Sequence, residues 1–356
     1  MTSSSPLSTW FPTNAALACF SAERLGRAPA LLPPRDRAWR AVAPGFRASL
    51  ALAASGLPFQ IAAERQYDPS ADPRRLPGAL AEGKTLFLPQ IHQVLPRLMR
   101  LMVTLRIAFI GPAEEECSFL FMVEGRGRPA MGLHHDGDVE SFWLQIEGRR
   151  TVTIGPPVPP GTPEDLPAGW PTRVASADGH VGARRRGWWT GDLPPGTLVY
   201  LPPRTPHDVI CRGRSLAISL TWKRRRGAPA VWTPPAAFAK RQAASLATWD
   251  VVSGRVQNIP RASRARLWTQ VPALAGPVDR ARHRLPLWLP DGAVLWLPSS
   301  ASPLARRLAL MPSLSRADAR GPALEPLVEH GVLALRDLPL VILPADPAAL
   351  DGWRFA

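Results

Sequence analysis

Two histidines and one aspartate are the side chains of this sequence best suited to hold a metal ion. His134 and Asp136 stand two positions apart, with His135 between them. On an extended strand, side chains two positions apart point the same way, so His134 and Asp136 can reach one ion while His135 points away. His207 follows a glycine turn, an apolar strand and a proline-rich bend. This pattern can deliver a third ligand to the rim of a β-barrel.

The ligand types favour iron over zinc. Two histidines and one carboxylate leave coordination positions open, which suits a non-haem Fe(II) that must bind oxygen and a cosubstrate together. Zinc sites are more often completed by sulfur or by a third histidine. No cysteine lies beside His134 or Asp136 in the chain. We therefore expect an Fe(II) centre at these residues.

Arg150 follows the metal motif at a spacing that suits binding of a cosubstrate. Residues 141–154 predict a strand, a turn at Gly148 and a second strand that opens with Arg149 and Arg150. A lone arginine usually lies on a solvated surface. One placed here in a β-barrel metal site can instead form a bidentate pair with the distal carboxylate of a dicarboxylic cosubstrate.

The elements that must position these residues are mainly short strands. Runs of β-forming residues, separated by Gly and Pro clusters, occupy 118–123, 141–146, 150–154, 197–201 and 215–222. This texture is typical of a β-sandwich or barrel. The proline-rich segment 155–171 is expected to be a long loop that could cover or block the site.

The flanking segments predict helices and a smaller second domain. Helices are expected over 15–27 and 94–107, with a strand over 85–88 between them. Beyond residue 227 we expect helices over 236–248, 261–269 and 323–330, and strand pairs within 285–297 and between 332–335 and 338–342. The fold class is mainly β with helices (α+β). The predicted domains are 1–226, which carries the metal motif, and 227–356, a helical, winged-helix-like module.

The composition narrows the classes of protein. With 42 prolines in 356 residues, a mostly helical protein is disfavoured. The net charge of +15 favours contact with nucleic acid. However, lysine supplies only Lys84, Lys223 and Lys240 among 43 basic residues, so the charge reflects coding composition as much as a partner. No P-loop, GxGxxG motif or Ser-His-Asp elbow stands in a suitable context, so the sequence gives little support to an NTPase, a dinucleotide-binding enzyme or a hydrolase.

The cysteines and the apolar runs predict a cytoplasmic protein. Cys19, Cys117 and Cys211 are far apart and form no CxxC pair, which argues against a disulfide framework or a zinc ribbon. The N-terminal residues lack the pattern of a signal peptide. No apolar run reaches the ~18 residues of a membrane span. We expect no membrane contact.

Three motifs together resemble a known family. They are His134-x-Asp136, the run FWLQIEGRR at 142–150 and the run PGTLVYLPPRTPH at 195–207. The pattern resembles the cupin-like JmjC oxygenases, and among them the ribosomal oxygenases, which hydroxylate side chains of ribosomal proteins. The resemblance covers residues 15–223, and a winged-helix part matches 280–343 more loosely.

The resemblance implies a double-stranded β-helix (jelly-roll, cupin) core and hydroxylation that depends on Fe(II) and 2-oxoglutarate. It implies that His134, Asp136 and His207 are the iron ligands. It also implies that Arg150 binds the distal carboxylate of 2-oxoglutarate. These relatives often form homodimers, and their substrate is a protein.

The sequence departs from the family in three places near the site, of which the long loop over 155–171 is one. The step from His134 to Phe142 is one position longer than usual, which leaves open that His135 is the ligand, partnered by Asp136 or Asp138.

In addition, Met122 stands where relatives place a small polar side chain near the cosubstrate. The supporting hydrogen bond must then come from elsewhere, with Ser118, Tyr200 and Thr221 as candidates. Tyr200 and Thr221 are therefore included among the predicted cofactor-binding residues, although core packing is a competing interpretation of Tyr200.

The most favoured function is hydroxylation of a protein side chain, on a ribosomal protein if the resemblance extends to the substrate. The same chemistry on a peptide or small molecule in biosynthesis is an alternative. A non-catalytic metal-binding cupin and a nucleic-acid-binding protein are alternatives from other classes.

Overall fold

The computed structural model describes residues 6–54, 59–70, 72–89, 91–93, 95–111, 113–125, 131–166, 187–224, 249–252, 266–269, 274–288, 294–308, 313–314, 327, 333–336 and 341–344. These residues belong to two compact units. The first unit is drawn from Met1–Pro89 and Cys117–Lys223, and the second from Gln90–Glu116 and Arg224–Asp346. The predicted division into 1–226 and 227–356 stays a prediction.

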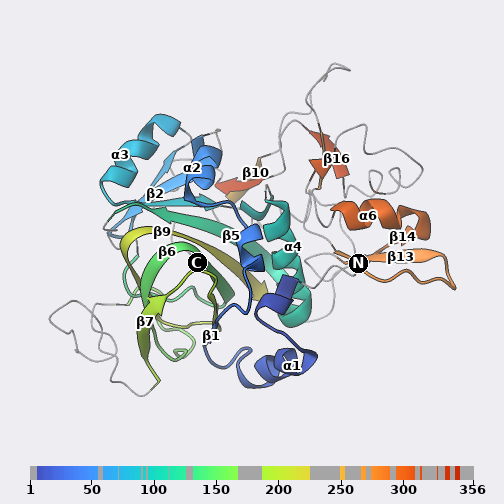
Figure 1. The fold of residues 1–356 in the computed structure, drawn as a ribbon, viewed down its shortest axis with the longest axis horizontal. Coiled ribbons are helices and arrows are strands. Elements are labelled where there is room, and N and C mark those ends of the chain that lie inside the picture. The colour runs from blue at the N-terminus through green and yellow to red at the C-terminus, as the bar shows by residue number, and fades with distance from the viewer. Residues whose placement is uncertain are drawn as a thin grey trace. The chain divides into compact units, whose positions relative to one another are not determined.

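One large sheet forms the first unit (Figure 1). Its strands follow the order β1-β8-β6-β9-β5-β4-β2-β3, and β7 pairs with β6. The bounds are β1 Ala30–Leu32, β2 Phe59–Ala63, β3 Gln66–Ser70, β4 Thr85–Pro89, β5 Ala113–Val123, β6 Glu140–Ile154, β7 Trp189–Leu193, β8 Leu198–Leu201 and β9 His207–Arg224. The predicted strands over 85–88, 118–123, 197–201 and 215–222 are confirmed, and the chain is mainly β with helices.

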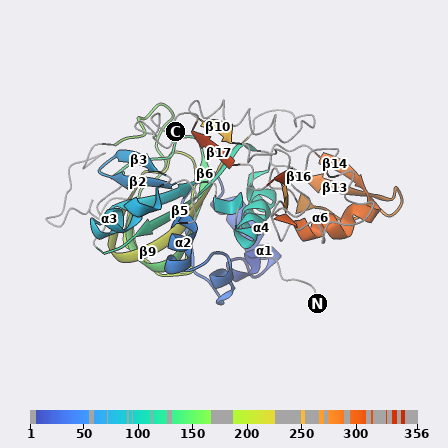
Figure 2. The same cartoon turned by 90° about the horizontal axis from the view of Figure 1, so that it is seen from above.

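Helices α1 (Asn14–Glu23), α2 (Phe46–Ala54) and α3 (Leu76–Ala81) flank this sheet, and α3 runs beside β2 and β3 (Figure 2). The Thr13 hydroxyl caps α1 by accepting from the Ala16 N–H at 3.1 Å. The helix ends before the predicted residue 27. Gly26 has φ +69°, a left-handed conformation that a helix does not continue.

The prediction of a turn at Gly148 is wrong, because β6 is one strand of 15 residues. Gly148 has φ +72° and lies at an irregularity in the β6–β9 register. A Cβ at this position would lie 1.7 Å from the carbonyl oxygen of Arg214, so no other residue fits without a backbone shift. The glycine makes a β-bulge, which bends β6 without ending it.

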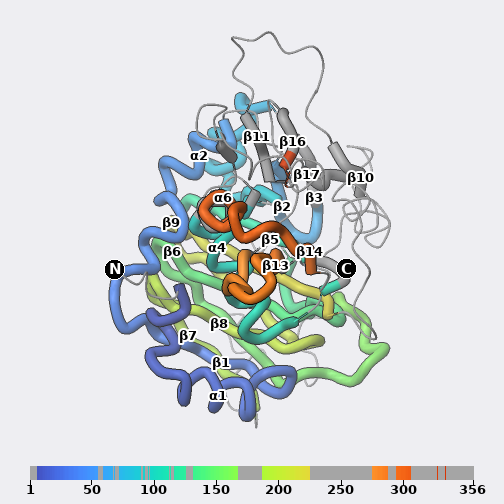
Figure 3. Tube along the Cα trace, turned by 90° about the vertical axis from the view of Figure 1, so that its right-hand side faces the viewer, coloured from blue at the N-terminus to red at the C-terminus, as the bar shows by residue number. Residues whose placement is uncertain are grey.

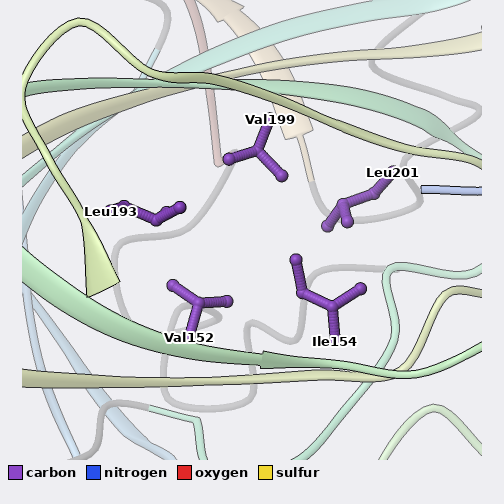
Figure 4. Close-up of a cluster of buried hydrophobic side chains, with 5 residues drawn as sticks. All are labelled: Val152, Ile154, Leu193, Val199 and Leu201. Atoms are coloured by element: carbon purple, nitrogen blue, oxygen red, sulfur yellow. The ribbon is translucent and has the colours of Figure 1, made fainter. Parts of the chain in front are cut away.

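The two faces of β6 have different surroundings. Phe142 pairs with Tyr200 of β8, and both rings contact Phe20 of α1. Trp143 points to the opposite face, by strand alternation, and contacts the ring of His207. On that inner face lies an apolar cluster, shown in Figure 4, of Val152, Ile154, Leu193, Val199 and Leu201.

The second unit contains α4 (Pro96–Leu105), which continues as a π-helical turn over Arg106–Ile110. The predicted helix over 94–107 is therefore confirmed. Arg106 and Glu116 form a buried ion pair, with Nε and Oε2 3.0 Å apart. None of the helices in the described part of the chain has the length and apolar character that a bilayer span requires.

A hairpin and several short strands complete the second unit. Among the described residues, the other strands and the other α-helix of this unit are β10 Trp249–Val252, β11 Arg266–Thr269, β12 Leu274–Ala275, β13 Arg284–Trp288, β14 Val294–Pro298, α6 Ser302–Leu308, β15 Ser313–Leu314, β16 Leu333–Arg336 and β17 Val341–Pro344. The predicted strand pair within 285–297 is confirmed as the antiparallel hairpin β13–β14. Figure 3 shows this hairpin beside α6.

Two predictions for the second unit are wrong. Residues 266–269 form strand β11 rather than the end of a helix. The strands over 333–336 and 341–344 do not pair with each other, because β16 pairs with β11 and β17 pairs with β10. The sequence indicates that these residues form strands, whereas the strand with which each one pairs depends on tertiary structure.

The predicted helix over 236–248 lies outside the described residues. The predicted helix over 323–330 also lies outside them, apart from Leu327, which is helical. The described strands therefore do not show the expected winged helix.

Candidate metal centre

His134 and His207 face each other across a short antiparallel bridge. The His134 N–H donates to the His207 carbonyl at 3.0 Å, and the His207 N–H donates back at 2.8 Å. Directly opposed residues in such a pair place their side chains on the same face. The two imidazole centroids are accordingly 4.2 Å apart. Residues far apart in the chain thus meet at one site.

Both histidines are oriented by backbone carbonyls. Nδ1 of His134 lies 2.8 Å from the Gly132 carbonyl oxygen, and Nδ1 of His207 lies 2.9 Å from that of Thr205. A carbonyl oxygen can only accept, so each Nδ1 carries the hydrogen. The lone pair of each neutral imidazole is then on Nε2. This is how ligand histidines are commonly fixed in metal sites.

Asp136 completes the cluster. Its Oδ1 lies 3.5 Å from Nε2 of His134 and 3.8 Å from Nε2 of His207. Its Oδ2 accepts a hydrogen bond from the Ser141 hydroxyl at 3.3 Å. One ligand atom from each of the three residues lies within 4.8 Å of the others. We call these three residues the triad.

Electrostatics keep two members of the triad in the ligand form at neutral pH. Burial lowers the pKa of His207 to about 4. Burial alone would raise the pKa of Asp136, but the neighbouring His207 and His134 lower it to about 2. For His134, burial is opposed by the hydrogen bond and charge of Asp136, and its pKa is raised. His134 is therefore the group most ready to exchange a proton for a metal ion.

The structure does not bring His135 to the triad. Its Nδ1 accepts from the Gly137 N–H at 3.1 Å, and its Nε2 lies 3.1 Å from the Thr162 carbonyl oxygen. Both ring nitrogens are therefore engaged with backbone groups, and His135 is buried. The alternative in which His135 replaces His134 as the ligand has no geometric support.

The described part of the loop after β6, residues 155–166, contacts the backbone of residues 133–136, which we call the ligand segment. In its described part, the Glu164 carbonyl accepts from the His135 N–H, and the Leu166 N–H donates to the Leu133 carbonyl. Beneath it, Leu133, Leu166 and Trp188 form a buried cluster.

Arg65 ties this loop and the ligand segment to the β2–β3 hairpin. Its Nη2 donates to the carbonyls of Leu133 at 3.0 Å and Leu166 at 3.1 Å, and its Nη1 lies 3.0 Å from Oδ1 of Asp165. Glu64 and Arg65 have φ +52° and +66°, as a tight hairpin turn requires. Each such non-glycine residue costs about 1 kcal/mol. The three contacts of the guanidinium help to offset that strain.

A second polar cluster lies on the same inner face of β6 and β9. Nε of Arg150 donates to the Ser215 hydroxyl at 2.9 Å, and Nε2 of Gln145 donates to the same oxygen at 3.1 Å. The guanidinium of Arg150 also stacks on the ring of Phe121, 5.6 Å from its centroid. We call Arg150, Ser215 and Gln145 the arginine cluster.

The arginine cluster contains a buried charge whose described partners are neutral. Arg150 is 8% exposed, and no carboxylate of the described residues forms an ion pair with it. Burial lowers the pKa of its guanidinium, because the charged form has lost its water. Oε1 of Gln145 is also buried and accepts no hydrogen bond within the described residues. Groups of this kind are stabilised when a polar or anionic ligand binds.

The other two predicted cofactor residues lie on opposite faces. Thr221 pairs with Ser141, so it shares the inner face with the triad. Tyr200 lies on the outer face, where its hydroxyl donates to Glu140 and accepts from the Gly26 N–H at 2.6 Å. The structure thus brings Thr221, but not Tyr200, to the face of the triad. Alternation from Phe142 could have indicated this.

Sequence reasoning missed Arg65, Ser215 and Gln145. Gln145 and Ser215 stand on predicted strands, but a neutral polar residue on a strand gives no signal of what it contacts. Arg65 lies in a hairpin that was not predicted. Its approach to the ligand segment depends on contacts across 68 positions of the chain.

The sequence matches no family model and no curated protein. It is similar in structure to YcfD, a ribosomal oxygenase from Escherichia coli, solved in complex with cobalt and 2-oxoglutarate. That match has a TM-score of 0.51 and 13% identity, and covers 91% of this chain and 99% of that one. A second structure of E. coli YcfD matches with a TM-score of 0.50 and 13% identity, over 90% of this chain and 98% of that one. The resemblance predicted from the motifs is confirmed at the level of the fold: the chain shares the cupin-like fold of a ribosomal oxygenase.

Proposed function

We propose that this chain is an Fe(II)- and 2-oxoglutarate-dependent dioxygenase that hydroxylates a protein side chain. His134, Asp136 and His207 would hold the metal. Their donor atoms lie within 4.8 Å of one another, and both imidazoles present Nε2 because Nδ1 is used by a backbone carbonyl. Two nitrogens and one carboxylate suit Fe(II) with open positions.

The observation that carries the proposal is the buried Arg150 on the same face as the triad. Arg150 lies four positions before Ile154, which pairs with His207. Four residues of strand span roughly 13 Å. An arginine side chain and a short dicarboxylate can bridge that distance together. Arg150 would form a bidentate pair with the distal carboxylate of 2-oxoglutarate, and Thr221 would contribute a hydroxyl from the same face.

When bound, Fe(II) and 2-oxoglutarate supply the oxidising chemistry that converts a C–H bond into a C–OH bond, with succinate and carbon dioxide as coproducts. The chain's own residues bind and orient. Asp136 and His207 remain in the ligand form at neutral pH, since their pKa values are about 2 and about 4. The apolar cluster beneath Trp143 excludes water on the inner face beside His207.

The substrate class rests on the fold. The structural match is to a protein described as a ribosomal oxygenase, which supports a side chain of a ribosomal protein as the target, encountered in the cytoplasm. The basic charge of +15 would favour approach to RNA-rich particles. The resemblance also leads us to expect a homodimer.

Mass spectrometry tests the substrate directly. Ribosomal proteins from cells with and without this gene should differ by one oxygen atom on one protein, and a His207→Ala chain should fail to restore it. If the ribosomal proteins are identical, the ribosomal substrate is wrong.

The enzyme class is tested separately. The purified chain with Fe(II) should release succinate from 2-oxoglutarate, and release should increase with substrate. His134→Ala and His207→Ala should abolish it. A chain that binds metal but never consumes 2-oxoglutarate would be a non-catalytic cupin, which would contradict the proposal.

A further inference from the structure

A basic and aromatic surface stands out on the β13–β14 hairpin of the second unit. β14 is the edge strand of its sheet and alternates between buried and exposed residues. Leu295 and Leu297 are buried, whereas Val294 and Trp296 are 39% and 46% exposed. An indole this exposed on an edge strand contributes little to the core of its own sheet.

Arginine lies against this indole. The guanidinium carbon of Arg284 is 3.9 Å from the centroid of the Trp296 ring, a stacked cation–π contact. Arg284 pairs with Pro298 in the hairpin register, so it shares a face with Trp296. The stack presents a flat, positively charged surface.

The residues just before β13 extend the charge. Arg280, Arg282 and His283 are exposed. Residues 274–288 contain three arginines and one carboxylate, Asp279. Asp279 is already engaged, because its Oδ1 accepts from the Arg282 N–H at 3.1 Å and its Oδ2 lies 3.4 Å from Nε of Arg284. The surface therefore carries net positive charge around a stacked aromatic ring.

We infer that this surface, defined by Arg280, Arg282, Arg284 and Trp296, binds single-stranded nucleic acid. Arginines contact phosphates, and an exposed aromatic ring stacks on an unpaired base. A duplex would hide its base faces from Trp296. An acidic peptide would satisfy the arginines but would have no base to stack on the indole. The combination of charge and ring thus favours unpaired nucleic acid, and it is independent of the metal centre.

The test uses the full chain without added metal. Fluorescence anisotropy would measure binding of labelled oligouridylate and oligothymidylate of equal length over a range of salt concentrations, with an RNA duplex and polyglutamate as competitors. We expect binding at low salt that weakens steeply as salt rises. A difference between oligouridylate and oligothymidylate would show whether the protein distinguishes RNA from DNA. Tight binding of either one supports the inference.

Variants separate stacking from charge. Trp296→Ala should weaken binding about 5- to 150-fold, whereas Trp296→Phe should keep most of it, since base stacking is worth about 1–3 kcal/mol. Arg280→Ala/Arg282→Ala should weaken binding and reduce the salt slope by about 2, or about 1 for each lost phosphate contact. Because Trp296 and both arginines are exposed, these changes should leave the thermal unfolding midpoint unchanged.

Arg74 and Arg75 provide the matched control. They are exposed neighbouring arginines of the first unit, each paired with an aspartate. Arg74→Ala/Arg75→Ala should bind the oligonucleotides like the unaltered chain. The inference fails if this control weakens binding as much as Arg280→Ala/Arg282→Ala, or if Trp296→Ala has no effect. It also fails if polyglutamate or the duplex competes as well as the single strand. None of these outcomes depends on 2-oxoglutarate turnover, so the proposed function is judged separately.

Discussion

The triad and the arginine cluster lie on the same inner face of the β6–β9 ladder, yet their charges are opposite. The triad combines one carboxylate, with a pKa of about 2, and two imidazoles, so its Nε2 and carboxylate atoms need a cation. The arginine cluster holds one buried guanidinium among neutral groups, so it needs an anion.

Together, the triad and the arginine cluster indicate what kind of ligand suits the inner face of β6 and β9. A buried ion without a partner destabilises the fold, whichever its sign. A metal ion at one end and a carboxylate at the other would correct both imbalances at once. A dicarboxylic cosubstrate that also coordinates the metal joins the two corrections in one complex. Neither cluster alone would specify that ligand.

Removal of a triad ligand should have the largest effect. His207→Ala should lower the affinity for Co(II) or Mn(II) by more than about 100-fold, because it deletes a ligand rather than one of its hydrogen-bond partners. Metal competition titration measures this. His135→Ala is the matched control and should keep metal affinity within a few fold. If His135→Ala abolishes binding and His134→Ala does not, the ligand assignment is wrong.

Replacement of Arg150 should separate the two clusters. Arg150→Met should raise the Kd of the metal-loaded protein for 2-oxoglutarate about 10- to 150-fold, since a charge-assisted pair is worth about 1.5–3 kcal/mol. Metal affinity should not change. Isothermal titration calorimetry with each ligand provides both numbers.

Arg150→Met should also have an unusual effect on the free energy of unfolding. In the ligand-free protein, Arg150→Met removes a buried charge, so the free energy of unfolding should stay the same or rise by up to about 2 kcal/mol. A large loss of stability would mean that Arg150 is a structural residue rather than one waiting for an anion. Urea unfolding distinguishes the two results.

The clusters should respond differently to pH. Below the raised pKa of His134, a proton must leave before a metal binds, so metal affinity should fall by about tenfold per pH unit as the pH decreases. His207 and Asp136 lose their protons by about pH 5, since their pKa values are about 4 and about 2. Arg150 stays charged throughout, so affinity for 2-oxoglutarate at saturating metal should be flat over the same range. A metal affinity that does not vary with pH would contradict the protonation assigned to His134.

Arg65 should affect the triad but not the arginine cluster, and by a smaller factor. Arg65→Ala should lower metal affinity about tenfold, because Arg65 positions the backbone before His134 without touching the ligands. Arg65→Lys should recover part of the loss. Arg75→Ala, which removes another hairpin-side arginine paired with Asp68, is the control and should leave metal affinity intact. Equal metal affinity in Arg65→Ala and the unaltered chain would show that Arg65 has no role at the triad.

The three residues that the structure brings together stood out in the sequence by type and spacing. Alternation predicted that His134 and Asp136 point the same way, although they lie in an isolated bridge and an irregular segment before β6 rather than in a strand. The proline-rich bend before His207 indicated the third residue. The pairing of His134 with His207 was not readable, because an isolated bridge is determined by how distant strands approach each other. The arginine cluster was only half predicted, since Arg150 stood out by charge while Ser215 and Gln145 did not.

The wrong predictions of the fold have physical causes. Gly148 is required by its positive φ, and both a tight turn and a β-bulge place glycine in that conformation, so local sequence does not distinguish them. The strands over 333–336 and 341–344 were found by their composition, but an adjacent strand is only one of several partners that an apolar run can pair with. The face of Tyr200 could not be predicted by alternation from His207, because prolines interrupt the strand between them; its buried ring on the outer face agrees with the core-packing interpretation.

Anaerobic binding of Mn(II) and 2-oxoglutarate to the unaltered chain, to His207→Ala and to Arg150→Met tests the joint role of the two clusters most directly. At a 2-oxoglutarate concentration a few times the Kd of the unaltered chain, equilibrium dialysis should find one metal ion and close to one 2-oxoglutarate on the unaltered chain. Arg150→Met should hold the metal with far less 2-oxoglutarate, and His207→Ala should hold neither. If 2-oxoglutarate binds His207→Ala as tightly as the unaltered chain, or if the unaltered chain binds no metal, the two clusters do not serve one complex.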